Sequence, residues 1–174
     1  FEKISNRSKN YNKKCFDVAL DILKKHKIAG LINGPMSKKH FLKKNFYGIT
    51  EYLAAKTKTK KFAMLIYNKK LSVCPITTHL ALKDVSKNIS KKNIINKVIL
   101  IKNFYKKFFK INASIGITGL NPHCESNYHS SEENNIIKPA IKMLQKKKIN
   151  ISGPFPADTI FIKENIKKFD VIIG

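Results

Sequence analysis

Residues 116–125 read Gly-Ile-Thr-Gly-Leu-Asn-Pro-His-Cys-Glu, and the residues just before them are apolar. This pattern predicts a buried strand over 113–120 that ends in a turn carrying His123. Pro122 stiffens that turn and so restricts the direction of the histidine side chain. The two glycines inside the strand, Gly116 and Gly119, indicate that some backbone approaches closely there.

Outward from this stretch, helical and strand-like patterns alternate, which is typical of an α/β fold. Helical patterns cover residues 12–27, 38–44, 50–57, 90–109 and 131–148, and strand-like runs cover 28–33, 62–67, 71–77, 149–152 and 169–174. Ser37 and Thr50 are expected to cap the second and third helices. Pro139 either kinks the last helix or marks its true start. A turn or helical turn is expected over 157–161, and the runs at 62–67 and 71–77 are expected to form a hairpin or neighbouring strands.

The formal net charge of +24 raises the question of a nucleic-acid partner. Of the 35 basic residues, however, only Arg7 is arginine, the residue that best recognises guanine and phosphate. The abundance of Lys, Asn and Ile is what an A+T-rich genome encodes, and the lysines are scattered through every segment. We therefore favour a drift in surface composition over specific nucleic-acid binding.

Cysteine use and hydropathy bear on location. The three cysteines are widely spaced and form no CxxC pair, which points to a reducing cytoplasm. No apolar run approaches the roughly 18 residues of a membrane span.

The chain starts at Phe1 and stops at Gly174 directly after an apolar run. We therefore expect residues 1–174 to be one continuous α/β region that lacks the N- and C-terminal portions of a longer protein.

Three side chains with metal-binding or acid–base chemistry follow predicted strands or lie in Gly/Pro-rich turns: His79, His123 and Asp158. In open α/β sheets, ligands bind at the carboxyl ends of the strands. Histidine nitrogen suits Zn²⁺, Co²⁺, Mn²⁺ or Fe²⁺. The two histidines can bind one such ion only if the fold brings their imidazoles together. Either histidine can instead be structural, and Asp158 is equally a helix N-cap or a carboxylate that orients a metal ligand or substrate.

Two further observations concern cofactor and substrate. Lys38 follows Gly34-Pro-Met-Ser, a position from which a lysine can hold a phosphate or carboxylate, or act as an acid or base. The sequence has neither a GxGxxG nor a GxxxxGK[ST] motif. A nicotinamide cofactor would therefore have to bind in some other way.

Taken in order, five motifs resemble the 4-hydroxythreonine-4-phosphate dehydrogenase family of vitamin B6 biosynthesis. They are Gly-Pro-Met-Ser-Lys at 34–38, Gly-Ile-Thr-Glu-Tyr-Leu-Ala at 48–54, Thr-Thr-His-Leu at 77–80, Gly-Leu-Asn-Pro-His at 119–123 and Gly-Pro-Phe-Pro-Ala-Asp-Thr at 153–159. The resemblance implies a sandwich like the isocitrate and isopropylmalate dehydrogenases, which bind NAD without a Rossmann fingerprint. It also implies a homodimer and a divalent metal (Zn, Mg, Mn or Co) bound by three histidines.

Two of those histidines match His79 and His123, and the third is expected in a Tyr-His-Asp-Gln motif after the strand that matches 171–174. The implied reaction oxidises 4-phosphooxy-L-threonine with NAD, and decarboxylation then gives 3-amino-2-oxopropyl phosphate. Asp158 would support the metal site and Lys38 would contact the substrate. Thr50 matches the position that binds the substrate's phosphate.

The chain departs from the family at Ile49, where the family usually has histidine in Gly-His-Thr-Glu. Losing one charge-assisted hydrogen bond costs about 1.5–3 kcal/mol, which puts the substrate in doubt more than the reaction type. The loop at 125–131 departs as well. A paralogue that oxidises a phosphorylated sugar acid such as 4-phosphothreonate is therefore an alternative. A basic nucleic-acid-binding module and an inactive truncated product are alternatives of other classes, and the 174 residues alone are expected to be inactive.

Overall fold

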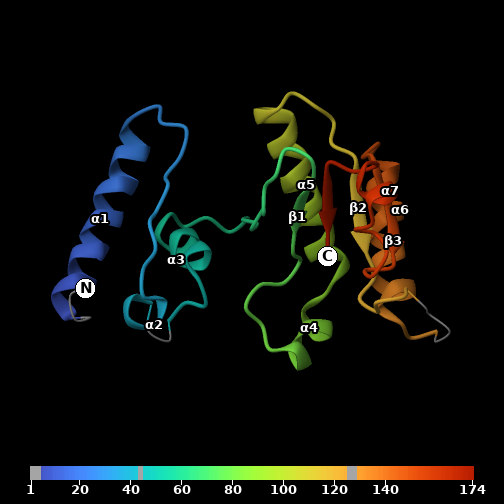
Figure 1. The fold of residues 1–174 in the computed structure, drawn as a ribbon, viewed down its shortest axis with the longest axis horizontal. Helices are drawn as coiled ribbons and strands as arrows, with labels where there is room; N and C mark the ends of the chain where they lie inside the picture. The colour runs from blue at the N-terminus through green and yellow to red at the C-terminus, as the bar shows by residue number, and fades with distance from the viewer. Residues whose placement is uncertain (1–4, 43–44, 125–128) are drawn as a thin grey trace. The chain divides into compact units, whose positions relative to one another are not determined.

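The structure, a computed structural model of the chain, describes residues 5–42, 45–124 and 129–174. The chain forms two compact units, residues 1–60 and residues 61–174 (Figure 1).

The first unit contains α1 (Asn6–Lys25), α2 (Lys38–Phe41) and α3 (Ile49–Lys56). Its small core is aromatic: the rings of Phe16, Phe41 and Tyr52 lie 5.1–5.6 Å apart, centroid to centroid. Helix α1 begins earlier than the predicted residue 12, because Ser5 and Ser8 form a capping box at its start. Segment 28–33 was predicted to be a strand, and that prediction was wrong. The described residues of this unit include no strand with which it can pair.

The two predicted caps in this unit have different outcomes. Helix α2 does begin directly after Ser37, although the serine side chain makes no capping hydrogen bond. Residues 43–44, at the predicted end of this helix, lie outside the described residues. The prediction that Thr50 caps α3 was wrong, because Gly48 is the N-cap and Thr50 lies within the first helical turn.

The second unit is built on a four-stranded sheet, with β1 (Ser72–Cys74), β2 (Ile115–Thr118), β3 (Ile151–Phe155) and β4 (Val171–Ile173). The strand order is β1-β4-β2-β3, and every neighbouring pair is parallel. An α/β fold with a parallel sheet is thus confirmed. Parallel strands are buried on both faces, which explains why β2 and β4 are almost entirely apolar.

The alternation of side chains along β4 separates two clusters of core residues. Val171 and Ile173 face a cluster that includes apolar residues of the helices Lys91–Phe108 and Lys138–Lys146. Ile172 packs with Ile160 and Phe169 on the opposite face. Gly116 leaves room for the Phe169 ring, since a Cβ at Gly116 would lie 3.2 Å from its carbon atoms. At Gly116 the close neighbour is therefore a side chain, whereas the sequence predicted a close approach of backbone.

The helices of the second unit are α4 (Leu82–Asn88), α5 (Lys91–Phe108), the π-helical turn η1 (Glu133–Ile137), α6 (Lys138–Lys146) and α7 (Lys163–Ile166). Helix α5 confirms the pattern predicted over 90–109, and the hydroxyl of Ser90 caps it by accepting from the Asn93 N–H at 3.2 Å. Pro139 lies in the first turn of α6, so it marks the true start of that α-helix. Helices α4 and α7 were not predicted.

The predicted hairpin is present only as a contact between two extended segments. Ile66 and Val73 form one antiparallel bridge, with N–H···O distances of 2.8 and 2.9 Å in the two directions. Strand β1 ends at Cys74, and the next residue, Pro75, has no N–H to donate to a ladder.

Along the described ranges, no helix is both long and apolar enough to cross a membrane.

Candidate functional site at the carboxyl edge of the sheet

The loops that follow β2 and β3 are joined by backbone hydrogen bonds, because these two strands are neighbours in the sheet. The Gly119 N–H donates to the Phe155 carbonyl at 3.0 Å, and the Ala157 N–H donates to the Pro122 carbonyl at 2.8 Å. The two sequence motifs that end in His123 and Asp158 therefore form one edge of the second unit.

His123 and Asp158 meet at this edge, with 3.1 Å between Nδ1 and Oδ2. Both side chains are substantially exposed, 65% for His123 and 42% for Asp158, so the contact adds little to stability. Its chemical effect is on the imidazole: a carboxylate that accepts from Nδ1–H leaves the Nε2 lone pair available to a ligand. Asp158 lies in the predicted turn at 157–161 and precedes no helix directly, so it is not a helix N-cap.

His79 follows β1, but it does not join this pair. Strand β4 lies between β1 and β2, so two strand spacings, about 10 Å, separate the strands that lead to the two histidines. Across the ranges the structure describes, no three His, Cys, Asp or Glu side chains gather in a way that could hold a metal ion. His79 has an exposed side chain and a positive φ of 60°, a conformation that is uncommon outside glycine.

A cavity of about 70 Å³ lies between the segments that lead to the two histidines. Its walls include Ile76 and Thr77 from the segment before His79, Gly119 and Leu120 from the segment before His123, and Gly174 at the end of β4. The cavity shows that these three segments converge.

Cys124 and Glu133 pack against the same loop. Burial raises the pKa of the Cys124 thiol, which disfavours the thiolate that a metal would need. Glu133 is only 1% exposed, and its Oε1 accepts a hydrogen bond from the Asn121 N–H at 2.8 Å. Residues 125–128, where the loop departs from the family pattern, lie outside the described residues.

Glu133 was missed in the sequence, although a signal was present. The buried side chains of η1 and α6 follow it at helical spacings, at Ile137, Ala140, Ile141 and Leu144. An acidic residue at the first position of such an apolar face is predicted to be buried, and a buried acidic group needs a hydrogen-bond partner.

The other two candidate residues belong to the first unit. Lys38 is the exposed first residue of α2, and Thr50 is half-buried in the first turn of α3. Ile49, which replaces the family histidine, packs against the aromatic cluster of that unit. The structure thus brings His123 and Asp158 into contact, and it places Lys38 and Thr50 in a different unit from the histidines.

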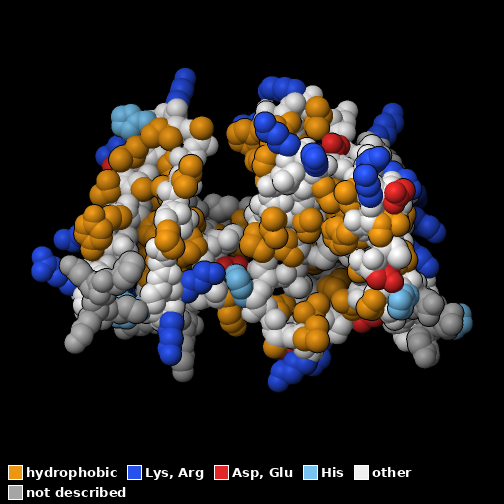
Figure 2. Space-filling view, viewed as in Figure 1, with side chains coloured by type: hydrophobic (Ala, Val, Ile, Leu, Met, Phe, Trp, Pro, Cys, Tyr) orange, Lys and Arg blue, Asp and Glu red, His pale blue; other side chains and the backbone are white. Residues whose placement is uncertain are grey.

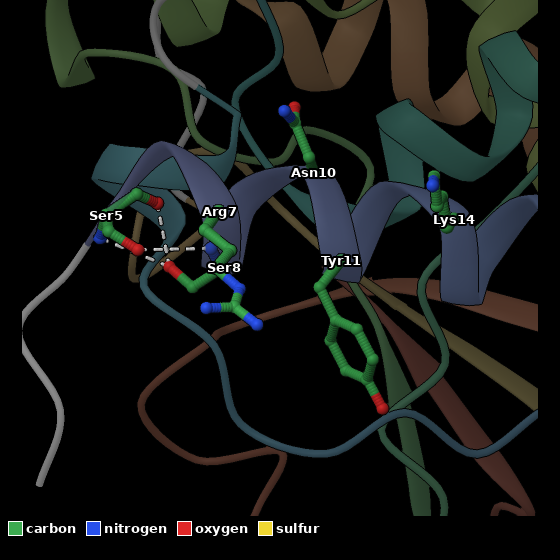
Figure 3. Close-up of a pocket in the computed structure, with 6 residues that line it drawn as sticks. All are labelled: Ser5, Arg7, Ser8, Asn10, Tyr11 and Lys14. Carbon is green, nitrogen blue, oxygen red and sulfur yellow. Dashed lines mark hydrogen bonds between the residues drawn. The ribbon is translucent and has the colours of Figure 1, made fainter.

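A pocket of about 700 Å³ lies beside the start of α1 (Figure 3). The described residues that line it all come from the first turns of this one helix: Ser5, Arg7, Ser8, Asn10, Tyr11 and Lys14. The hydroxyls of Ser5 and Ser8 are already engaged in the capping box, as the dashed lines in Figure 3 show. We therefore do not assign the functional site to this pocket.

Lysine and arginine side chains are scattered over both units and do not form a single stripe on the face drawn in Figure 2. A groove that tracks a nucleic-acid backbone would concentrate them.

Comparison with known proteins defines the class to which this fold and site belong. The profile of the family described as "Pyridoxal phosphate biosynthetic protein PdxA" matches residues 1–174, so the chain belongs to the PdxA family. The 4-hydroxythreonine-4-phosphate dehydrogenase of Sulfurihydrogenibium sp. (strain YO3AOP1) is 43% identical over 158 residues, which cover 88% of this chain and 48% of that protein.

Two further relatives extend the comparison. The crystal structure of 4-hydroxythreonine-4-phosphate dehydrogenase from Klebsiella pneumoniae matches with a TM-score of 0.85 and 26% identity, covering 99% of this chain and 54% of that one. The D-threonate 4-phosphate dehydrogenase of Salmonella typhimurium is 27% identical over 164 residues, covering 92% of this chain and 50% of that protein. The chain thus spans about half the length of the relatives that it matches.

Proposed function

We propose that this chain is part of an enzyme that oxidises 4-phosphooxy-L-threonine in an NAD- and divalent-metal-dependent reaction within vitamin B6 biosynthesis. The observation that carries the proposal is the contact between His123 and Asp158 at the carboxyl edge of a parallel sheet in a PdxA-family chain. We further propose that the enzyme is a cytoplasmic homodimer with an isocitrate-dehydrogenase-like sandwich fold.

The donor chemistry of the edge fits a divalent cation, since imidazole nitrogens are good ligands for Zn, Mn or Co. His123 and His79 would hold the metal, and Asp158 would orient His123 through Nδ1. A catalytic zinc site usually has three protein ligands. The strand order supports a third ligand directly after β4, because β4 lies between the strands that lead to His79 and His123.

The proposed reaction is an oxidation of the substrate's C3 hydroxyl group followed by decarboxylation. A bound divalent cation would lower the pKa of the substrate's 3-hydroxyl, and NAD⁺ would take the hydride from C3. The hydroxyl proton leaves to a base or water, and the resulting β-keto acid loses CO₂ to give 3-amino-2-oxopropyl phosphate. Lys38 makes a polar contact with the substrate, and Thr50 binds its phosphate end. We propose that the 174 residues alone are inactive, because their described part holds no three-donor metal cluster.

A second candidate is the oxidation of 4-phosphothreonate, and Ile49 favours it. An isoleucine that packs on the aromatic cluster of the first unit cannot donate the hydrogen bond of the family histidine. The D-threonate 4-phosphate dehydrogenase among the relatives shows that this activity occurs in similar proteins. The two candidate substrates differ at C2, where 4-phosphooxy-L-threonine has an amino group and 4-phosphothreonate has a hydroxyl group. The second candidate therefore does not require the site to bind an amino group.

The test uses the gene product that contains this chain, with NADH formation measured on both phosphorylated substrates. We expect His123→Ala and His79→Ala to abolish turnover, whereas His26→Ala in the exposed C-cap of α1 leaves it intact. A higher kcat/KM for phosphothreonate would select the second candidate. Normal turnover in both histidine variants would refute the proposed metal site.

A further inference from the structure

A buried acidic residue supports the loop that carries His123. Glu133 is the first residue of the π-helical turn η1, and its side chain is 1% exposed. Its Oε1 accepts a hydrogen bond from the Asn121 N–H at 2.8 Å, two residues before the histidine. Burying an acidic side chain is unfavourable unless hydrogen bonds compensate for the lost water, so this bond stabilises one particular arrangement of the two groups.

The loop from Gly119 to Cys124 is packed closely around this carboxyl group. A Cβ placed on Gly119 would lie 3.1 Å from Glu133 Oε1 and 3.2 Å from the Asn121 carbonyl oxygen. The Cys124 N–H donates to that same carbonyl at 2.9 Å, which closes the turn. Glu133 therefore holds the turn from the side of η1.

The loop after β3 also holds the turn. Pro122 accepts from the Ala157 N–H at 2.8 Å, and His123 contacts Asp158 at 3.1 Å. The imidazole itself is 65% exposed, so its direction depends on how the backbone of the turn is fixed and on the contact with Asp158. Without the Glu133 bond, the turn would keep its internal Cys124–Asn121 hydrogen bond and its contacts with the loop after β3, but it would lose a tie to η1.

The position of Glu133 is costly for a residue that serves stability only. It begins the apolar face formed by Ile137, Ala140, Ile141 and Leu144, where a leucine would contribute to the core without a buried polar group. It also lies in a π-helical turn, and such turns frequently occur at functional sites. Both observations indicate a role for the carboxyl group beyond packing.

We infer that Glu133 is a positioning residue, which fixes the His123 turn through the Asn121 N–H and so sets the direction of the imidazole. The inference rests on the proposed function in one respect: the consequence for a ligand assumes that His123 binds a divalent metal. The hydrogen bond and its effect on the turn do not depend on that assumption.

The test compares three variants of the gene product that contains this chain. Glu133→Leu keeps the volume and the apolar face but removes the acceptor, whereas Glu133→Gln keeps an oxygen that can accept from the Asn121 N–H. Glu132→Leu is the matched control, because it removes the neighbouring carboxyl group, which caps nothing in η1. Amide hydrogen exchange by NMR reports on the turn, and calorimetric titration with Co²⁺ alone reports on metal binding.

We expect Glu133→Leu to raise exchange at the amides of Asn121, Cys124 and Ala157 while the amides of β4 keep their protection. We also expect it to weaken Co²⁺ binding about tenfold or more, the range found for residues that orient metal ligands. Glu133→Gln and Glu132→Leu should leave both measurements close to those of the unmodified chain. Glutamine has no charge but keeps the acceptor oxygen. If the negative charge of Glu133 were what matters, Glu133→Gln would behave like Glu133→Leu in both measurements.

Three results would overturn the inference. They are an Asn121 amide that stays protected in Glu133→Leu, a uniform loss of protection that includes β4, and unchanged Co²⁺ binding despite a loosened turn. If the unmodified gene product that contains this chain binds no Co²⁺, the proposed metal site fails. The exchange pattern then still decides whether Glu133 fixes the turn.

Discussion

Replacing Gly119 by alanine tests how closely the turn after β2 is packed. A Cβ at this position would overlap the Cys124 sulfur, and it would lie 3.1 Å from Glu133 Oε1 and 3.2 Å from the Asn121 carbonyl oxygen. The φ angle of Gly119 is not in the left-handed region, so the backbone itself accepts alanine and the cost is steric. Forcing a methyl group into such a packed site costs about 1–3 kcal/mol, and the sulfur is the atom most in the way.

The assay is a double-mutant cycle measured by urea unfolding. Cys124→Ala removes the sulfur, so Gly119→Ala should cost less in that background than in the unmodified chain. We expect a coupling of about 1–2 kcal/mol in the direction of rescue, which lies within the range for residues in direct contact. Gly30→Ala is the control, since a Cβ at Gly30 would meet no atom within 4 Å, and this change should be neutral or slightly stabilising.

Two results would refute this reasoning. If the costs of the two single substitutions simply add, the sulfur is not the obstacle, and the turn must relax in another way. If Gly119→Ala costs no more than Gly30→Ala, the turn is looser than the structure shows.

Three other predictions concern separate features. Asp158→Asn should change the free energy of unfolding by less than about 1 kcal/mol, because the pair with His123 is exposed; calorimetry should show Co²⁺ binding about tenfold weaker or more. Lys110→Gly should stabilise the chain by about 1 kcal/mol in thermal unfolding, because Lys110 follows α5 with a φ of 61°, where glycine is favoured. Burial raises the pKa of the Cys74 thiol, so its reactive thiolate forms only at higher pH than usual. Mass spectrometry after iodoacetamide treatment should therefore show exposed Cys15 alkylated well before Cys74, and labelling of Cys74 should increase as the pH rises.

Sequence periodicity predicted those parts of the fold that create their own signal. The apolar spacing in 90–109 gave α5 almost to the residue, because one face of that helix packs on the sheet along its whole length. The apolar run at the end of the chain correctly predicted the buried strand β4.

Features that depend on distant partners could not be predicted in this way. Segment 28–33 has the composition of a strand, but a strand forms only beside another strand, and the described part of its unit has none. Helix α4 was missed because it carries no clear apolar face: Leu82 is 88% exposed, and the helix buries no residue. Both errors arise from tertiary context that the local sequence does not record.

The candidate site shows the same division. The rule that ligands bind at the carboxyl ends of parallel strands selected His123 and Asp158, and the adjacency of β2 and β3 then brought the two side chains to 3.1 Å. The same rule selected His79, but it could not supply the strand order, which places β4 between the two histidines. Spacing in the sequence identifies which residues lie at the edge of a sheet, whereas the order of the strands decides which of them meet.

Strand order also explains why the support of the site lies where sequence reasoning did not look. Because β2 and β3 are neighbours, their loops hold each other at the His123 turn, and a helical turn that follows in the chain adds a second support. Glu133 provides that support from η1 through the Asn121 N–H. A buried carboxyl group needs a hydrogen-bond partner, so an acidic residue at the start of an apolar helical face indicates that a donor lies nearby. Here the donor is the Asn121 N–H in the His123 turn. Glu133 therefore helps to locate the candidate site as much as His123 does.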